Sequence, residues 1–139
     1  MNILIVEDHA ATAKLLSEYL TKQGEYDVID IAYNGKEAIK KITQKPVDVV
    51  LMDVNMPFVD GIEATENILY KIPHIKVLML SVYSEPWIIK RSIKAGAHGY
   101  LNKKAGIDKI SQAITEISRG KPYLDESSLN TIMNDYDYS

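Results

Sequence analysis

Short apolar runs recur along the chain, and amphipathic stretches separate them. Continuous runs that are rich in β-branched residues are typical of strands covered on both faces, as in parallel sheets. Five such runs predict strands, over residues 2–6, 28–32, 47–52, 75–80 and 98–101.

The stretches between these runs carry apolar residues at helical spacing. The clearest example is the last, where isoleucines recur at a three-four-three step from Ile107 to Ile117. Pro86 suits a first helical turn, and Gly96 suits a C-terminal cap. The predicted helices span residues 10–23, 35–44, 61–72, 86–95 and 107–118.

Alternating strands and helices predict a particular class of fold. Five βα repeats imply right-handed crossovers and a doubly wound α/β sheet with helices on both faces. The length of 139 residues favours a single domain. Because sheets of this class bind ligands outside the carboxyl ends of their strands, the candidate chemistry should lie there.

Polar side chains follow four of the five predicted strands. Glu7 and Asp8 end the first strand, Asp53 the third and Ser81 the fourth, while Lys103 follows the fifth. A lone acid after a strand is more often the cap of the next helix. Three acids, a hydroxyl and an ammonium on one sheet edge are much harder to attribute to capping.

The grouping of these side chains indicates a reaction. Clustered carboxylates repel one another and need a cation, and hard oxygen ligands favour Mg²⁺. A lysine beside the acids offers a second positive charge to a phosphoryl group. Since a carboxylate can itself act as the nucleophile, the edge is suited to forming an aspartyl phosphate.

Composition narrows the alternatives. Hydrophobic residues make up 46% of the chain and charged residues 25%, as in ordinary globular domains. The absence of cysteine excludes disulfides, thiolate metal sites and a cysteine nucleophile, and fits a reducing compartment. A net charge of −3 argues against a general nucleic-acid surface, and no apolar run approaches the ~20 residues of a membrane span.

Four motifs, taken in order, resemble the receiver domain of two-component response regulators over residues 1–120. They are "ILIVED", "LMDVNMPFVDG", "LMLS" and "AGAHGYLNKKA". The last motif supplies Tyr100 as the switch aromatic. Lys103, rather than Lys104, matches the lysine that this family places three residues after the aromatic.

The resemblance implies a flavodoxin-like (βα)5 receiver fold whose five parallel strands have the order 2-1-3-4-5. It implies that Asp53 accepts a phosphoryl group from a phosphohistidine on a sensor histidine kinase. Mg²⁺ would be bound by Asp8, by Asp53, by the main-chain carbonyl of Asn55 and, through a water, by Glu7.

The resemblance also assigns a switch and a cellular setting. Lys103 would contact the phosphoryl group, Ser81 would move toward it, and Tyr100 would move inward. Asn55 and Tyr83 hold positions that tune the lifetime of the phosphoryl group in this family. Such a domain is a cytoplasmic signalling module that catalyses only its own phosphorylation and dephosphorylation, and that dimerises when phosphorylated.

After Gly120 the pattern changes, and we expect residues 121–139 to form a linker or tail without a strand–helix unit of its own. A short helix is allowed within 125–135. The phrase "ISRGKPYLDESSL" resembles regulators whose receiver precedes a LuxR-type helix-turn-helix. We therefore expect a receiver cut from a longer transcription regulator, which contacts DNA only through an output domain not present in this chain.

Other interpretations stay open on the sequence alone. A stand-alone receiver would signal by protein contact, with or without phosphorylation. An aspartyl-phosphate phosphatase would need an acid where Asn55 stands, and a flavin-binding domain of the same topology would need a hydroxyl-rich loop where "EDHAATAK" is acidic. We interpret His9 as a loop residue at the mouth of the site.

Overall fold

The computed structural model describes residues 1–56 and 59–135. Within them the strands are β1 (Asn2–Val6), β2 (Asp27–Ala32), β3 (Val49–Asp53), β4 (Lys76–Ser81), β5 (Gly99–Asn102) and β6 (Tyr123–Leu124). The helices are α1 (Ala10–Lys22), α2 (Gly35–Ile42), α3 (Gly61–Lys71), α4 (Pro86–Lys94), α5 (Asp108–Ser118) and α6 (Glu126–Met133), with a 3-10 turn η1 (Lys103–Ala105).

The strands form one parallel sheet in the order β2-β1-β3-β4-β5-β6. The predicted α/β class, parallel pairing and order of the first five strands are confirmed. The expectation of five strands is wrong for the described residues, because β6 adds a sixth at the edge, pairing Tyr123 with Gly99 and Leu124 with Tyr100. Two residues are too few to show a strand period, so the sequence pattern could not predict β6.

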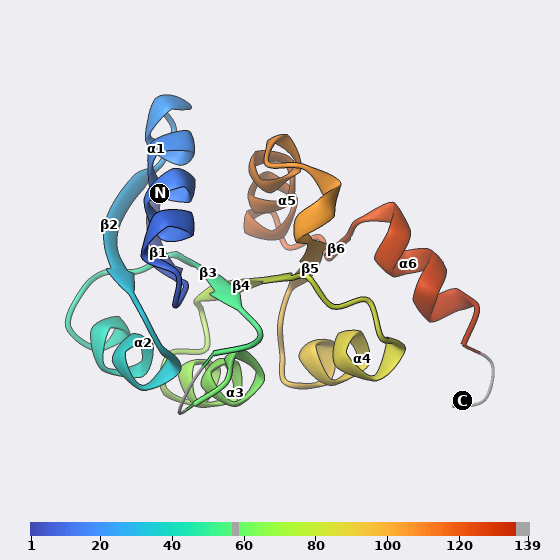
Figure 1. Cartoon of the computed structure of the whole chain (residues 1–139). Coiled ribbons are helices and arrows are strands. Elements are labelled where there is room, and N and C mark those ends of the chain that lie inside the picture. The colour runs from blue at the N-terminus through green and yellow to red at the C-terminus, as the bar shows by residue number, and fades with distance from the viewer. Residues whose placement is uncertain (57–58, 136–139) are drawn as a thin grey trace.

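Helices cover both faces of the sheet (Figure 1). α1 and α5 lie on one face, and α2, α3 and α4 lie on the other. Alternate residues of the central strands divide between two buried clusters: Leu4 and Val50 pack toward α2, α3 and α4, whereas Ile5 and Leu51 pack toward α1 and α5. This two-sided burial explains the continuous apolar runs in the sequence.

Local chemistry fixes where several helices begin. The side chains of Asn34, Asp60 and Asp125 accept a backbone N–H in the first turn of α2, α3 and α6, respectively. Pro86 occupies the first turn of α4, and Gly96 adopts φ of 109° just after that helix, both as predicted. Asp60 is thus a helix cap.

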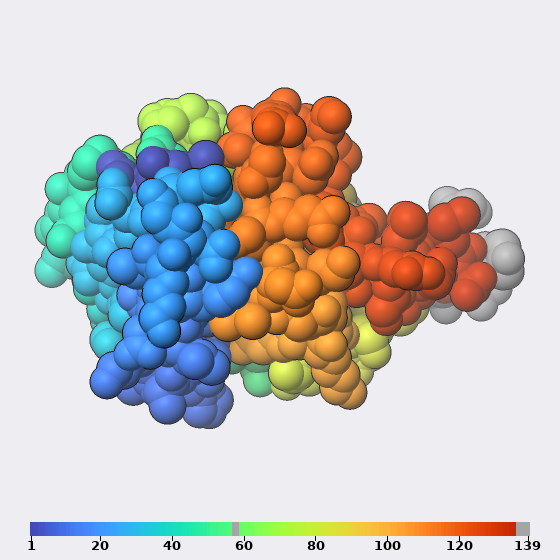
Figure 2. Space-filling model, turned by 90° about the horizontal axis from the view of Figure 1, so that it is seen from above, coloured from blue at the N-terminus to red at the C-terminus, as the bar shows by residue number. Residues whose placement is uncertain are grey.

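Residues 121–135 carry more secondary structure than the sequence pattern predicted. The short helix within 125–135 is confirmed as α6, but the expectation that this segment lacks a strand–helix unit is wrong, because β6 leads directly into α6. α6 packs against α4 and β5, and Lys90 Nζ lies 2.8 Å from Asp135 Oδ2. In Figure 2 the red C-terminal segment stands out from one side of the molecule. Residues 136–139 of the expected tail lie outside the described residues.

Across residues 1–56 and 59–135, no helix combines the length and the apolar character that crossing a membrane requires.

Candidate functional site

The carboxyl ends of β1 and β3 bring the predicted acids together. These two strands are neighbours in the sheet, so Glu7 and Asp8 after β1 lie beside Asp53 at the end of β3. Lys103 begins η1 directly after β5 and reaches across to the same place. Residues that are up to 96 positions apart therefore meet at one edge of the sheet.

Lys103 is the cation that joins two of the acids. Its Nζ lies 2.7 Å from Glu7 Oε1 and 3.6 Å from Asp53 Oδ1. Burial tends to lower the pKa of Lys103, but the hydrogen bond to Glu7 and the charge of Asp53 raise it above its ordinary value. Lys103 therefore stays an ammonium beside the site.

The two aspartates respond differently to the same crowding. Burial, followed by the negative charge of Glu7, raises the pKa of Asp53 to about 7, although Lys103 opposes this shift. Burial acts in the same direction on Asp8, yet hydrogen bonding with Glu7 and Asp53 and the charge of His9 lower its pKa overall. Asp8 thus keeps its charge while Asp53 is the acid that holds a proton more readily, as expected for carboxyls that share a site.

The donor set fits a divalent cation. Asp8 Oδ1 is buried and accepts no hydrogen bond, which leaves a carboxylate oxygen available as a ligand. Ligand atoms of Glu7, Asp8 and His9 all lie within 4.8 Å of one another. His9 Nδ1 lies 3.3 Å from Asp8 Oδ1, so His9 lies at the mouth of the site, where the sequence analysis placed it.

Gly61 allows the chain to turn back tightly after β3. A Cβ at this position would lie 2.1 Å from the carbonyl oxygen of Asp53 and 2.8 Å from Cα of Val54. Its N–H donates to the carbonyl of Val54 at 2.8 Å. The start of α3 thus packs against the backbone that carries Asp53.

Ser81, Tyr83 and Tyr100 form a second group next to the acids. The N–H of Tyr83 donates to Ser81 Oγ at 2.9 Å, and the Tyr100 hydroxyl donates to the carbonyl of Tyr83 at 2.8 Å. Tyr100 is fully buried. Whether Ser81 and Tyr100 exchange positions stays a prediction.

Tyr83 makes more hydrogen bonds around the site than the sequence suggested. Besides its two backbone contacts, its hydroxyl accepts a hydrogen bond of 2.8 Å from Asn55 Nδ2 across the mouth of the site. One residue thus links Asn55, Ser81 and Tyr100. The sequence showed only that Tyr83 lies two residues after Ser81. It could not show that the backbone of Tyr83 is hydrogen-bonded to both Ser81 and Tyr100.

Comparison with known proteins defines the class. Residues 3–115 match the family model described as the response regulator receiver domain. This match covers well over half of the chain, and the chain therefore belongs to the response regulator receiver domain family. Receiver domains are signalling domains rather than conventional enzymes, which argues against the phosphatase and flavin-binding interpretations.

Curated relatives are longer than this chain. It is 34% identical over 134 residues to the response regulator protein VraR of Staphylococcus aureus, covering 96% of this chain and 64% of VraR. It is 32% identical over 137 residues to the oxygen regulatory protein NreC of Staphylococcus carnosus, covering 98% of this chain and 63% of NreC. The chain thus spans less than two thirds of the length of these relatives.

Solved structures agree on the fold. A two-component response regulator of the LuxR family from Aurantimonas superposes with a TM-score of 0.91 at 25% identity, covering 95% of this chain and 94% of that one. CheY of Borrelia burgdorferi, in a complex with CheX, BeF3⁻ and Mg²⁺, superposes with a TM-score of 0.79 at 30% identity. That match covers 84% of this chain and 88% of CheY.

Proposed function

We propose that this chain is a phosphorylation-controlled switch in which Asp53 accepts a phosphoryl group from a sensor histidine kinase. The observation that carries the proposal is the position of Lys103 Nζ, 2.7 Å from Glu7 and 3.6 Å from Asp53. This ammonium stands where it can contact an anion that extends from the Asp53 carboxylate.

Four residues would hold Mg²⁺ at this edge. Asp8 and Asp53 would bind it through carboxylate oxygens, Asn55 through its main-chain carbonyl, and Glu7 through a water. The buried Asp8 Oδ1 without a hydrogen-bond partner supports this assignment. When bound, Mg²⁺ neutralises negative charge on the transferring phosphoryl group.

The reaction is a displacement at phosphorus. A carboxylate oxygen of Asp53 forms the new O–P bond while the P–N bond to the kinase histidine breaks, and the electron pair of that bond returns to the imidazole. Lys103 stabilises the charge on the phosphoryl oxygens, where a fixed cation has its greatest effect. Water then hydrolyses the acyl phosphate, which releases inorganic phosphate and returns Asp53 to a carboxylate.

The switch operates through the hydrogen bonds of Tyr83. When Ser81 turns its hydroxyl toward the phosphoryl group, it gives up the 2.9 Å contact with the N–H of Tyr83. Tyr100 is bonded to the same residue, so a change at Ser81 reaches the outer strands of the sheet. This is a two-state element that a modification biases.

The partners follow from the family rather than from this chain alone. The solved neighbours include RcsB bound to DNA, in one case as two dimers on two parallel DNAs, although at 20% identity they establish only the fold here. We propose that the phosphorylated receiver dimerises and acts on transcription through a DNA-binding domain that is not among these residues. A cytoplasmic location stays a prediction.

The test is mass spectrometry of the intact chain after treatment with acetyl phosphate. We expect one phosphoryl group, placed on Asp53 and dependent on Mg²⁺. Asp53→Ala should abolish the modification, whereas Asp48→Ala, at the opposite edge of the sheet, should leave it unchanged. An Asp53→Ala chain that is modified as well as the wild type would refute the proposal.

A further inference from the structure

Asp125 is a buried acid far from the proposed phosphorylation site in sequence. It lies between β6 and α6 and is 5% exposed. It also lies beyond residue 115, where the match to the family model ends. Its carboxylate binds two parts of the molecule at once.

The first part is the end of β5. Asp125 Oδ1 accepts a hydrogen bond of 3.0 Å from the backbone N–H of Asn102. β6 pairs with β5 only as far as Tyr100, so the N–H of Asn102 has no strand partner on that side. The carboxylate takes the place of the missing strand carbonyl and satisfies a buried N–H.

The second part is the start of α6. The N–H of Ser128 donates to Asp125 Oδ2 at 3.3 Å, and the Ser128 hydroxyl donates to Oδ1 at 2.6 Å. Asp125 is therefore the N-cap of α6 as well as the acceptor for β5. Any movement of α6 at this end acts directly on Asn102.

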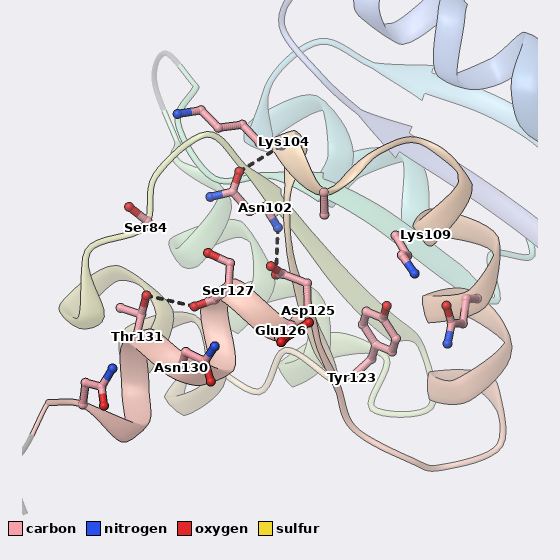
Figure 3. Close-up of a pocket in the computed structure, with 13 residues that line it drawn as sticks. Ser84, Asn102, Lys104, Lys109, Tyr123, Asp125, Glu126, Ser127, Asn130 and Thr131 are labelled. Carbon is pink, nitrogen blue, oxygen red and sulfur yellow. Dashed lines mark hydrogen bonds between the residues drawn. The ribbon is translucent and has the colours of Figure 1, made fainter.

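Asn102 in turn holds η1. Its side-chain oxygen accepts a hydrogen bond of 2.9 Å from the N–H of Lys104. Figure 3 shows both bonds, from the N–H of Asn102 to Asp125 and from the N–H of Lys104 to the side chain of Asn102. Lys103 lies between these two residues, so its backbone is fixed on either side.

We propose that Asp125 is a positioning residue for Lys103, and that its hydrogen bond to the N–H of Asn102 thereby controls the rate at which Asp53 is phosphorylated. This inference rests on the proposed function, because it assumes that Lys103 contacts the phosphoryl group. Asp125 touches neither the phosphoryl group nor Mg²⁺. It acts by keeping the Lys103 ammonium in reach of Asp53, and a small misplacement of such a group is costly.

The decisive variant is Asp125→Ser in the full chain. Serine still caps α6, but its shorter side chain does not reach the N–H of Asn102. We expect phosphorylation by saturating acetyl phosphate to slow about tenfold. The Mg²⁺ dissociation constant, measured by calorimetry, should stay unchanged, because the proposed ligands lie at and just after the ends of β1 and β3.

Two further variants complete the test. Asp125→Asn keeps an acceptor oxygen in place and should restore a rate near that of the wild type. Asp135→Ser is the matched control, since it removes the contact of the C-terminal segment with Lys90 and leaves Asn102 untouched. Its rate should equal that of the wild type.

The outcomes separate the two proposals. If the wild type is modified on Asp53 and Asp125→Ser reacts equally fast, the role of Asp125 is refuted and the proposed function stands. Loss of Mg²⁺ affinity in Asp125→Ser would mean general damage to the fold and would also refute the positioning role. A wild type that is not modified on Asp53 would instead overturn the proposed function.

Discussion

The strands begin at one side of the sheet, here called the amino edge, and end at the other, the carboxyl edge. Polar groups are paired differently at these two edges. At the amino edge, Asp48 accepts a hydrogen bond of 2.8 Å from the N–H of Asn2, and His98 Nδ1 accepts one of 3.0 Å from the N–H of Val77. At the carboxyl edge, Glu7 and Asp53 contact Lys103, and Asp8 Oδ1 has no hydrogen-bond partner. Polar side chains at the amino edge are used in hydrogen bonds that stabilise the fold. The carboxyl edge instead has a carboxylate oxygen without a partner, which is typical of a functional site.

Glycine substitutions give the largest expected contrast between the edges. Gly61→Ala at the carboxyl edge places a Cβ against backbone atoms of Asp53 and Val54, which cannot move aside cheaply. We expect a loss of about 3 kcal/mol in the free energy of unfolding, measured by urea denaturation. Gly24→Ala near the amino edge meets no atom within 4 Å and should cost only about 1 kcal/mol, for its φ of 77°. Equal losses would contradict the steric argument.

Removal of Lys103 tests the chemistry of the carboxyl edge. Lys103→Met keeps the unbranched stem of the side chain but removes the ammonium that contacts Glu7 and Asp53. We expect phosphorylation by acetyl phosphate to slow about a hundredfold, as for other groups that stabilise charge in a transition state. The neighbouring variant Lys104→Met is the control and should react at the normal rate. A normal rate in Lys103→Met would remove the role of the ammonium.

Repulsion among the acids should lower the free energy of unfolding, so that removing one acid raises it. At pH 8 without Mg²⁺, Asp53→Asn removes one of three crowded negative charges and should raise the free energy of unfolding by about 1 kcal/mol. Addition of Mg²⁺ should stabilise the wild type more than the variant, so that the difference shrinks. Asp48→Asn, at the amino edge, should not be stabilising. A wild type that is already the more stable protein without Mg²⁺ would contradict the repulsion.

His98 provides the smallest effect and belongs to the amino edge. Burial, assisted by the charge of Lys76, lowers the pKa of His98 below its ordinary value. The unfolded chain therefore binds the proton more readily, so this contribution to stability is complete above about pH 6.5 and is lost as the pH falls through the folded pKa. We expect the change to be no more than about 1 kcal/mol.

The measurement is urea denaturation of the wild type and His98→Asn between pH 5 and pH 8. Asparagine can still accept the N–H of Val77 but does not titrate in this range. The variant should therefore lose less stability on acidification, while its phosphorylation should remain normal. Identical pH profiles would show that His98 is not responsible.

Much of the fold was predictable because burial on both faces leaves a plain pattern. The five longer strands and their helices appear as apolar runs and helical spacings, and their observed bounds lie within two residues of the predicted ones. β6 was not predictable, because its two residues depend on an edge of β5 that only the folded sheet provides. Tertiary context, rather than local pattern, creates that strand.

The site divides in the same way. The position of Asp53, Asp8 and Lys103 at strand ends followed from sequence, because parallel strands deliver their carboxyl ends to one edge. The direct contact of Glu7 with Lys103 did not follow, since it depends on side-chain reach across two elements. The burial of Tyr100 and the hydrogen bonds of Tyr83 could be found only from the structure, because the sequence does not show which backbone groups are hydrogen-bonded.

The carboxylate at the end of β6 has a practical consequence for anyone who grafts this receiver onto a different effector. A cut at residue 115, where the family match ends, would discard Asp125 and leave the N–H of Asn102 without its acceptor. A chimaera joined after Met133 retains the bond that holds the strand next to Lys103.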